Sequence, residues 1–410
     1  MNVIILDWDS FGDMEPVFMR RGYNVKKCPI EVKADAIKIK AEEHLLKEMI
    51  ESAFGVDKPD YVFSFNYYPF ASNVCQEYDV PYISWVYDSP FLAIYSYTVI
   101  NPVNRIFMFD YAIYQEFANN GIETVHYLPL AVDQYALEKK CGKPGENVPG
   151  EVKYSQSYLN LSSGRTGLDA DIAFVGSLYT EQWNRLYDKF STVSAYTKGY
   201  LDAIIQAQKN VYGDNFLEKL LTPEIIEDMQ KAYPCDPNSL DVMTPAQIYA
   251  QFVLSRQVTS LERTEVLTEL GKQFKNKKLM LYTVDSGAKI DGWKNIGPVE
   301  YFNEMPQVFR CSKINLNITL KSIMTGIPLR AFDIMGAGGF LLTNYQQEYD
   351  EYFIAGEDYV YYENYEDLLN KAEYYLSHHK ERKDIALNAC VKVRKNHTLD
   401  ARLDVMESTL

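Results

Sequence analysis

Short apolar runs alternate with helical patterns along most of this chain of 410 residues. Such alternation is typical of parallel sheets whose two faces are covered by helices. In the first part we expect strands at residues 2–6, 61–65, 82–87, 106–109 and 124–127. Helical stretches are expected between them, at residues 13–21, 41–54, 69–78 and 111–120. The fold class that follows is α/β.

The second part of the chain repeats this alternation after a break. Residues 137–169 are rich in Gly, Pro, Ser and Lys, which predicts a linker or a long surface loop. Residues 180–274 read as nearly continuous helix, and we interpret them as an insertion. Strands are expected at residues 171–176, 278–282, 313–318, 340–343 and 359–361, and helix from Tyr365 to the end.

These patterns predict two Rossmann-like, doubly wound domains that face each other across a cleft. We expect the first at residues 1–150 and the second at residues 170–395, with the helical insertion at about 180–274. Residues 396–410 are expected to form a final helix that packs back on the first domain.

Composition excludes several classes of function. The net charge of -15 disfavours nucleic acid as a partner. No run of residues approaches the roughly 18 apolar residues that a membrane span needs. The start, MNVIILDWDSFG, lacks the basic residues of a signal peptide. Six scattered cysteines indicate reduced thiols, a cytoplasmic location and no zinc site.

Residues 311–343 hold the most specific pattern in the chain. A buried strand is followed by a Gly-Pro turn, a helix that begins near Leu329, a glycine pair and a second buried strand. The first amides of such a helix lack intrahelical partners, and together with the helix dipole they suit a diphosphate. The pattern therefore predicts a site for a nucleotide diphosphate.

Side chains around that helix fit the same ligand. Arg330 lies at the helix start, where its fork suits phosphate oxygens, although it can also cap its own neighbourhood. Asp333, one turn further, suits ribose hydroxyls, or it is a carboxylate favoured by the helix dipole. Gly338 and Gly339 let the backbone pass close to a ligand or to the next strand.

Further donor-binding candidates follow other predicted strands. Lys321 can reach a phosphate or be a lone loop lysine. Gly176 and Ser177 close the first strand of the second domain, where an amide can meet the diphosphate, or they form a tight turn. Tyr282, at a strand end, stacks on the base or packs in the core.

In the first domain, polar side chains follow the predicted strands. Asp88 and Asp9 are candidate catalytic carboxylates, because each follows a predicted strand and a carboxylate at such a position can accept a proton from a ligand. The alternative for Asp88 is an Asp-Ser-Pro turn in which the carboxylate caps local amides. Asn66 and Ser89 are candidate acceptor-binding residues by position.

Several of these segments together resemble one known family. The chain resembles the CgeB-like branch of the group 1 glycosyltransferases, which is named after a spore-coat maturation protein. The resemblance rests on DIAFVGSLY from Asp171, GPVEY from Gly297, residues 311–343, YYLSHHKER from Tyr374, NHT from Asn396, DWDSFG from Asp7 and WVYDSP from Trp85.

The resemblance implies a GT-B fold and a metal-independent transferase. Its donor would be a nucleotide sugar, UDP-, GDP- or dTDP-linked, held by the second domain as a substrate, with no cofactor. Its acceptor would be a hydroxyl of a surface protein such as a flagellin, of a polysaccharide or of another glycan. Retaining relatives carry two glutamates eight positions apart. Asp333 matches the second, but the first falls on Thr325, so the stereochemistry of transfer stays open.

Two alternatives remain at this point. A nucleotide-sugar 2-epimerase can use the same fold and the same donor. A non-catalytic surface or spore-assembly protein that retains nucleotide-sugar binding is the other alternative, and the departure at Thr325 keeps it open.

Overall fold

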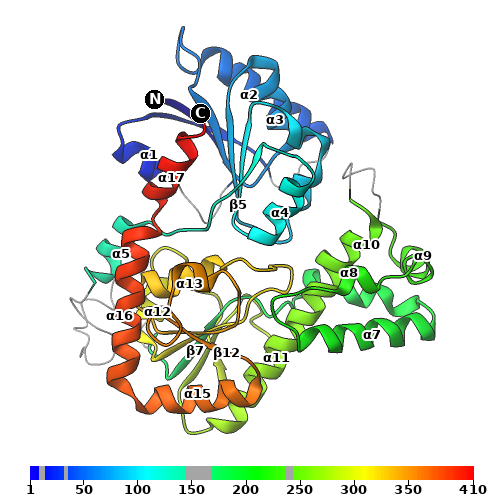
Figure 1. The fold of residues 1–410 in the computed structure, drawn as a ribbon, viewed down its shortest axis with the longest axis vertical. Helices are drawn as coiled ribbons and strands as arrows, with labels where there is room; N and C mark the ends of the chain where they lie inside the picture. Colours follow the sequence, from blue (N-terminus) through cyan, green and yellow to red (C-terminus); the bar gives the residue numbers. More distant parts are fainter. Residues whose placement is uncertain (9–13, 32–35, 145–167, 236–242) are drawn as a thin grey trace. The chain divides into compact units, whose positions relative to one another are not determined.

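The computed structural model describes residues 1–8, 14–31, 36–144, 168–235 and 243–410 (Figure 1). The described chain forms two compact units. Unit 1 contains Met1–Leu130 and the C-terminal Leu399–Leu410, and unit 2 contains Ala131–Cys235 and Pro245–Thr398.

Unit 1 is built on a six-stranded parallel sheet with the order β2-β1-β3-β4-β5-β6. The strands are β1 (Asn2–Asp7), β2 (Asn24–Pro29), β3 (Tyr61–Phe65), β4 (Tyr82–Val86), β5 (Asn104–Met108) and β6 (Val125–Tyr127). The sequence pattern did not predict β2. It is an edge strand whose residues, NVKKCP, are mostly exposed, so it lacks the apolar run of a central strand.

Helices surround this sheet. They are α1 (Glu15–Arg20), α2 (Ala36–Ser52), α3 (Pro69–Tyr78), α4 (Tyr111–Asn119) and α17 (Leu399–Glu407), with 3-10 turns η1 (Leu92–Tyr95) and η2 (Tyr97–Ile100). Proline at the start of α3 and Asp110 before α4 mark the two helix beginnings, and the Asp110 carboxylate accepts from the amide of Ala112.

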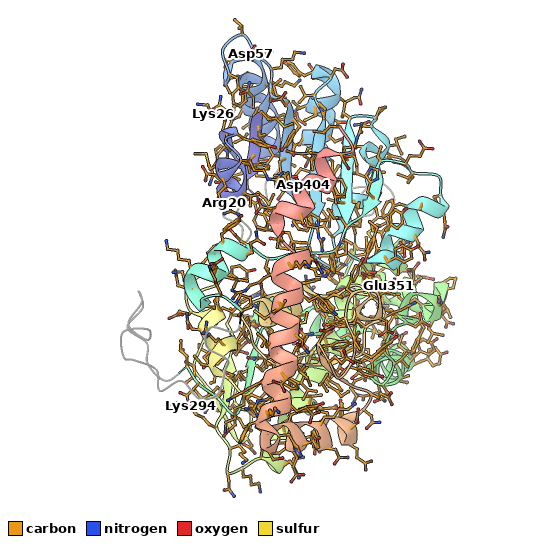
Figure 2. All side chains as sticks on the ribbon, turned by 60° about the vertical axis from the view of Figure 1, so that its left-hand side comes forward. Arg20, Lys26, Asp57, Lys294, Glu351 and Asp404 are labelled. Carbon is orange, nitrogen blue, oxygen red and sulfur yellow. The ribbon has the colours of Figure 1, made fainter. Side chains whose placement is uncertain are left out.

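The last helix, α17, is bonded to the first residues of the chain. Arg21 forms ion pairs with Asp400 and Asp404, at 3.4 and 2.6 Å. The Glu407 carboxylate accepts hydrogen bonds from the hydroxyls of Tyr23 and Tyr61, at 3.0 and 2.7 Å. In Figure 2 the labels Arg20 and Asp404 mark the two sides of this contact. The chain therefore returns to unit 1 at its end.

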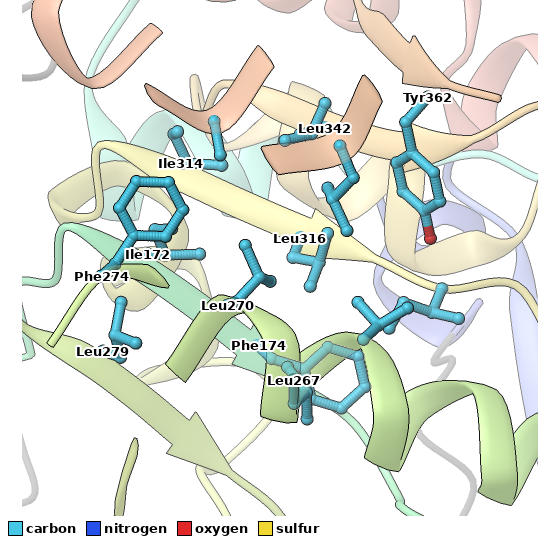
Figure 3. Packing of buried hydrophobic residues seen from close by; sticks show 14 of the residues in the cluster. Ile172, Phe174, Leu267, Leu270, Phe274, Leu279, Ile314, Leu316, Leu342 and Tyr362 are labelled. Atoms are coloured by element: carbon cyan, nitrogen blue, oxygen red, sulfur yellow. The ribbon is translucent and has the colours of Figure 1, made fainter. Parts of the chain in front are cut away.

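Unit 2 contains a second six-stranded parallel sheet, with the order β12-β11-β10-β7-β8-β9. Its strands are β7 (Ile172–Val175), β8 (Leu279–Tyr282), β9 (Trp293–Asn295), β10 (Ile314–Asn317), β11 (Leu341–Asn344) and β12 (Val360–Tyr362). The pattern did not predict β9, which at 3 residues is too short to give a period. Buried side chains of helix α11 (Ser255–Gln273), such as Leu267 and Leu270, pack on one face of this sheet (Figure 3).

The other helices of the α/β part of unit 2 are α5, which precedes its first strand, and a set that follows β9, β10, β11 and β12. They are α5 (Gln134–Cys141), α12 (Met305–Cys311), α13 (Leu329–Gly336), α14 (Tyr349–Tyr352), α15 (Tyr365–Ser377) and α16 (His379–Asn396). The sequence pattern predicted a loop from Leu137, but residues 134–141 form helix α5. The Asp133 carboxylate caps this helix by accepting hydrogen bonds from the amides of Tyr135 and Ala136. Most of the expected loop, residues 145–167, lies outside the described residues.

The helical insertion has a hydrophobic core of its own, which includes Phe190, Leu201, Met229 and Tyr249. Its elements are η3 (Gln182–Asn184), η4 (Leu186–Thr192), α7 (Ala195–Lys209), α8 (Leu217–Leu220), α9 (Pro223–Ala232), α10 (Pro245–Ile248), the π-helical η6 (Tyr249–Leu254) and α11. Helix α11 leads from this core to the sheet, since its later residues belong to the core of the sheet.

The predicted α/β class is confirmed: each unit is built on a six-stranded parallel sheet with helices around it. In the part of the chain that the structure describes, no helix is both long enough and apolar enough to cross a membrane.

We predict that Leu403→Ala lowers the unfolding free energy of unit 1 by about 2 to 5 kcal/mol, because Leu403 is fully buried and alanine leaves a cavity. Val405→Ala, on the same helix but 43% exposed, is the matched control and should change stability by about 0.5 kcal/mol or less. Urea titrations followed by circular dichroism measure both. Equal effects of the two changes would show that α17 is not part of the core of unit 1.

Candidate functional site

Each sheet reverses its strand order at one point. In unit 2 the chain proceeds from β7 to β8 and β9 on one side, and then from β10 to β11 and β12 on the other. The reversal therefore lies between β7 and β10. In unit 1 it lies between β1 and β3. Ligands of open parallel sheets bind outside the carboxyl ends of the strands at such a reversal, so these two positions are the candidate sites.

Helix α13 begins at the candidate site of unit 2. It follows β10, and its N-cap residue, Pro328, is extended and has no side-chain acceptor for the first turn. The helix start is therefore confirmed at Leu329, the expected residue. The amides of Leu329 and Arg330 lack intrahelical acceptors and, with the helix dipole, favour an anion.

The loop before α13, residues 319–328, is held by side chains at the end of β11 and directly after it. Asn344 accepts from the amide of Thr319 at 2.8 Å, and Gln346 donates to the carbonyl of Gly326 at 3.2 Å. The Glu348 carboxylate accepts from the hydroxyl of Thr325 at 2.8 Å. All three side chains are buried, so the helix start is fixed in place without regular structure before it.

Arg330 and Asp333 form an ion pair along α13, with 3.2 Å between Nη1 and Oδ2. The hydroxyl of Tyr301 donates to the other oxygen of Asp333 at 2.9 Å. Burial raises the pKa of the Asp333 carboxyl to about 6, although Arg330 and Tyr301 act in the opposite direction. The sequence pattern placed Arg330 and Asp333 on one face of this helix. It did not predict the ion pair between them or the hydrogen bond from Tyr301 to Asp333.

Lys321 does not lie as predicted. Its ammonium donates to the carbonyl of Val211 at 3.1 Å, lies 3.4 Å from Glu262 and stands 3.8 Å from the ring centre of Tyr212. Burial lowers the pKa of this lysine. Because these groups surround the ammonium, Lys321 ties the helical insertion to the sheet, and its assignment to a phosphate is corrected.

Gly176 and Ser177 lie at the reversal, directly after β7. The Ser177 hydroxyl donates to Glu181 at 2.7 Å. The Ser177 carbonyl accepts from Nη1 of Arg263 at 2.6 Å, and the carbonyl of Ile318, after β10, accepts from Nε and Nη2 of the same guanidinium at 3.2 and 2.5 Å. Sequence reasoning missed Arg263, because it lies within the expected insertion helix.

Gly338 and Gly339 lie away from this site. They follow the end of α13, with φ +84° at Gly338, and their amides donate to the carbonyls of Met335 and Ile334 in its last turn. A helix that starts at the carboxyl edge of a parallel sheet ends at the amino edge, so the glycine pair faces the next strand and not the ligand. This corrects its assignment to the donor.

Tyr282 also has a structural position. Its side chain is buried, and its hydroxyl donates to the carbonyl of Leu168 at 3.1 Å. The structure therefore favours core packing over stacking on a base, the alternative named from the sequence.

In unit 1 the structure brings Asn66 and Asp88 together. Asn66 follows β3 at the reversal and has a left-handed backbone, with φ +60°. Its amide donates to the Asp88 carboxylate at 2.8 Å, and its Oδ1 accepts from the amides of Tyr87 and Asp88 at 3.2 and 3.3 Å. Asn66 therefore orients Asp88, which is itself exposed.

Aromatic side chains surround this pair. The rings of Trp8 and Tyr87 are stacked with 6.4 Å between their centres. Burial and the nearby Asp88 carboxylate raise the pKa of Tyr68. Ser89 follows directly, before a cis peptide bond to Pro90. The other predicted carboxylate, Asp9, lies outside the described residues. At this end of the sheet of unit 1, the exposed carboxylate of Asp88 therefore lies near the rings of Trp8 and Tyr87. Polar groups beside aromatic rings suit a polyhydroxylated ligand.

Among the described residues, no three His, Cys, Asp or Glu side chains are grouped as the ligands of a metal ion.

Known proteins resemble this chain in part of its sequence and in its fold. Residues 263–408 match a family model described as glycosyl transferase-like. No curated protein matches the sequence. Sucrose-phosphate synthase from Thermosynechococcus elongatus has a similar structure, with a TM-score of 0.50 at 8% identity over 100% of this chain and 98% of that chain. A glycosyltransferase from Rickettsia africae ESF-5 gives 0.50 at 10% identity over 99% and 98%. At these identities the likeness establishes the GT-B fold.

The raised pKa of Asp333 predicts a pH-dependent stability. The folded state favours the neutral carboxyl, so its contribution is present below the ordinary pKa and is lost as the pH rises through about 6. Between about pH 4 and about pH 7, the unfolding free energy of the wild type relative to Asp333→Asn should fall by on the order of 2 kcal/mol. Denaturant titrations at several pH values measure this difference.

Asp350→Asn, which removes an exposed acid of the same unit, controls for the general effect of losing a carboxylate. A difference between wild type and Asp333→Asn that stays constant with pH would show that Asp333 titrates as an ordinary exposed acid.

Proposed function

We propose that this protein, a glycosyltransferase of the GT-B fold, moves a sugar from a nucleotide-diphosphate donor bound by unit 2 to an acceptor hydroxyl bound by unit 1. The observation that carries the proposal is the start of α13. It lies at the strand-order reversal of unit 2 and within residues 263–408, the segment that matches the glycosyl transferase-like model.

On the donor side, the amides of Leu329 and Arg330 take the charge that develops on the leaving diphosphate as its bond to the sugar breaks. The guanidinium of Arg330 adds a positive charge at the same end of the helix, held in orientation by Asp333. Asp333 in turn accepts a hydrogen bond from Tyr301, and we assign it to the ribose. These groups stabilise the leaving group without a metal ion.

On the acceptor side, Asp88 accepts the proton of the attacking hydroxyl as the new bond to the sugar forms. Asn66 fixes the orientation of that carboxylate through one hydrogen bond to the acid and two from the backbone amides beside it. Ser89 and the stacked rings of Trp8 and Tyr87 provide polar and apolar contacts for a sugar or peptide acceptor.

We also propose a branch of the family, a cellular location, a donor and an acceptor for this protein. The motifs quoted from the sequence favour the CgeB-like branch, and the scattered cysteines favour the cytoplasm. We propose a UDP-, GDP- or dTDP-linked donor, and a protein such as a flagellin, or a polysaccharide, as the acceptor. The matched segment and the fold support the class of enzyme, and the sequence motifs support the branch.

The first test is a thermal-shift screen of the full chain with UDP, GDP, dTDP, CDP and their common sugar conjugates, in magnesium and in EDTA. We expect one nucleotide family to raise the melting temperature equally in both, because a ligand of the native state stabilises it. No shift with any nucleotide would contradict the donor site. Formation of a new nucleotide sugar without an acceptor would instead identify an epimerase.

Asp88→Asn tests the acceptor side separately. It should lower the rate constant of transfer by about a hundredfold or more, with unchanged affinity for the donor nucleotide, because it removes only the proton acceptor. Turnover assays with the donor from the screen and a panel of glycan and protein acceptors measure this. Asp57→Asn, another exposed acid of unit 1, is the control. Full activity of Asp88→Asn would remove Asp88 from the mechanism.

A further inference from the structure

Arg263 lies at the strand-order reversal of unit 2, although it belongs to a helix that precedes β8. Its guanidinium donates three hydrogen bonds, one to the carbonyl of Ser177 and two to the carbonyl of Ile318. These carbonyls follow β7 and β10, the two strands that flank the reversal. The side chain is 9% exposed, so its charge lies almost entirely away from solvent.

This guanidinium is buried and forms no ion pair with a carboxylate among the described residues, although the charge of the buried Glu262 acts on it from a distance. The nearest acid in sequence, Glu262, accepts from the hydroxyl of Tyr212 at 2.5 Å and lies 3.4 Å from the ammonium of Lys321. The rings of Phe174 and Tyr179, with centres 5.5 and 5.1 Å from the guanidinium carbon, provide only partial compensation. Buried charges in proteins are normally paired, because an unpaired one is costly.

Arg263 also has more N–H donors than its hydrogen bonds use. A guanidinium carries five N–H groups, and three are used here, one each on Nε, Nη1 and Nη2. One N–H on each terminal nitrogen has no acceptor in the part of the chain that the structure describes. A fixed cation with spare donors, at the position where open sheets bind their ligands, fits an anion.

We propose that Arg263 is a positioning residue for the diphosphate of the donor. It supplies a fixed positive charge below the reversal, and it holds the backbone of Ser177 and Ile318 where the diphosphate meets the strand ends. This inference rests on the proposed function, since it names a residue of the same donor site. If Arg263 has this role, the affinity for the donor depends on the charge of its phosphates, and the residue responsible lies on α11.

The test compares ligands that share a base but differ in charge. Affinities for uridine, UMP and UDP, or for the same series of whichever base the wild type binds, are measured by calorimetry for wild type and Arg263→Gln. We expect affinity for the diphosphate to fall by about tenfold or more, affinity for the monophosphate to fall less, and affinity for the nucleoside to stay within about twofold. The diphosphate affinity of the variant should also depend less on salt.

Arg256→Gln is the matched control, because Arg256 lies on the same helix and its guanidinium stands over the ring of Phe252, within the insertion. Equal losses for all three ligands in Arg263→Gln would show a structural role only and would overturn the inference. If Arg263→Gln does not fold, Arg263→Lys, which keeps the charge, replaces it. Equal losses of affinity for the nucleoside, the monophosphate and the diphosphate in Arg263→Lys would likewise overturn the inference. A wild type that binds no series of any base overturns the proposed function and this inference with it.

Discussion

The reversal of strand order in a parallel sheet is the constraint on which both candidate sites depend. The two strands at this point are parallel, but the chain connections that follow them go to opposite sides, so the backbone groups at their carboxyl ends need partners from elsewhere. In unit 2 Arg263 supplies these partners, and in unit 1 the side chain of Asn66 binds the backbone after β4. The residues that satisfy the strand ends are thus the residues that shape each site.

Buried polar side chains also fix the loop that precedes α13 in the donor site. Asn344, Gln346 and Glu348 alternate along one segment, and each binds the loop before α13. A loop held at three points cannot move without leaving buried polar groups unpaired, at a cost of about 1 to 3 kcal/mol each. The amides at the start of α13 are therefore oriented before a ligand arrives, as electrostatic stabilisation of a leaving group requires.

Sequence reasoning succeeded where the controlling interactions are local. Apolar runs gave the central strands, and the Gly-Pro turn gave the start of α13 at Leu329. It failed where the partner is distant: Arg263 binds carbonyls 55 and 86 residues away, and the partners of Lys321 belong to the insertion. The glycine pair was misassigned for another reason, because a glycine near a helix fits either a ligand or a helix end, and only the direction of α13 distinguishes them.

The residue at Thr325 shows how a chain can depart from a family pattern in sequence while keeping the chemical group nearby. Relatives with two glutamates place an acid at this position, and here it is threonine. The Glu348 carboxylate nevertheless accepts from the Thr325 hydroxyl, and the Glu348 amide donates to the Thr325 carbonyl at 3.2 Å. A buried carboxylate from a segment 23 residues later thus lies against the loop. The Thr325 hydroxyl is thus held by a buried acid that is distant in the sequence, a contact that a family pattern compared position by position does not predict.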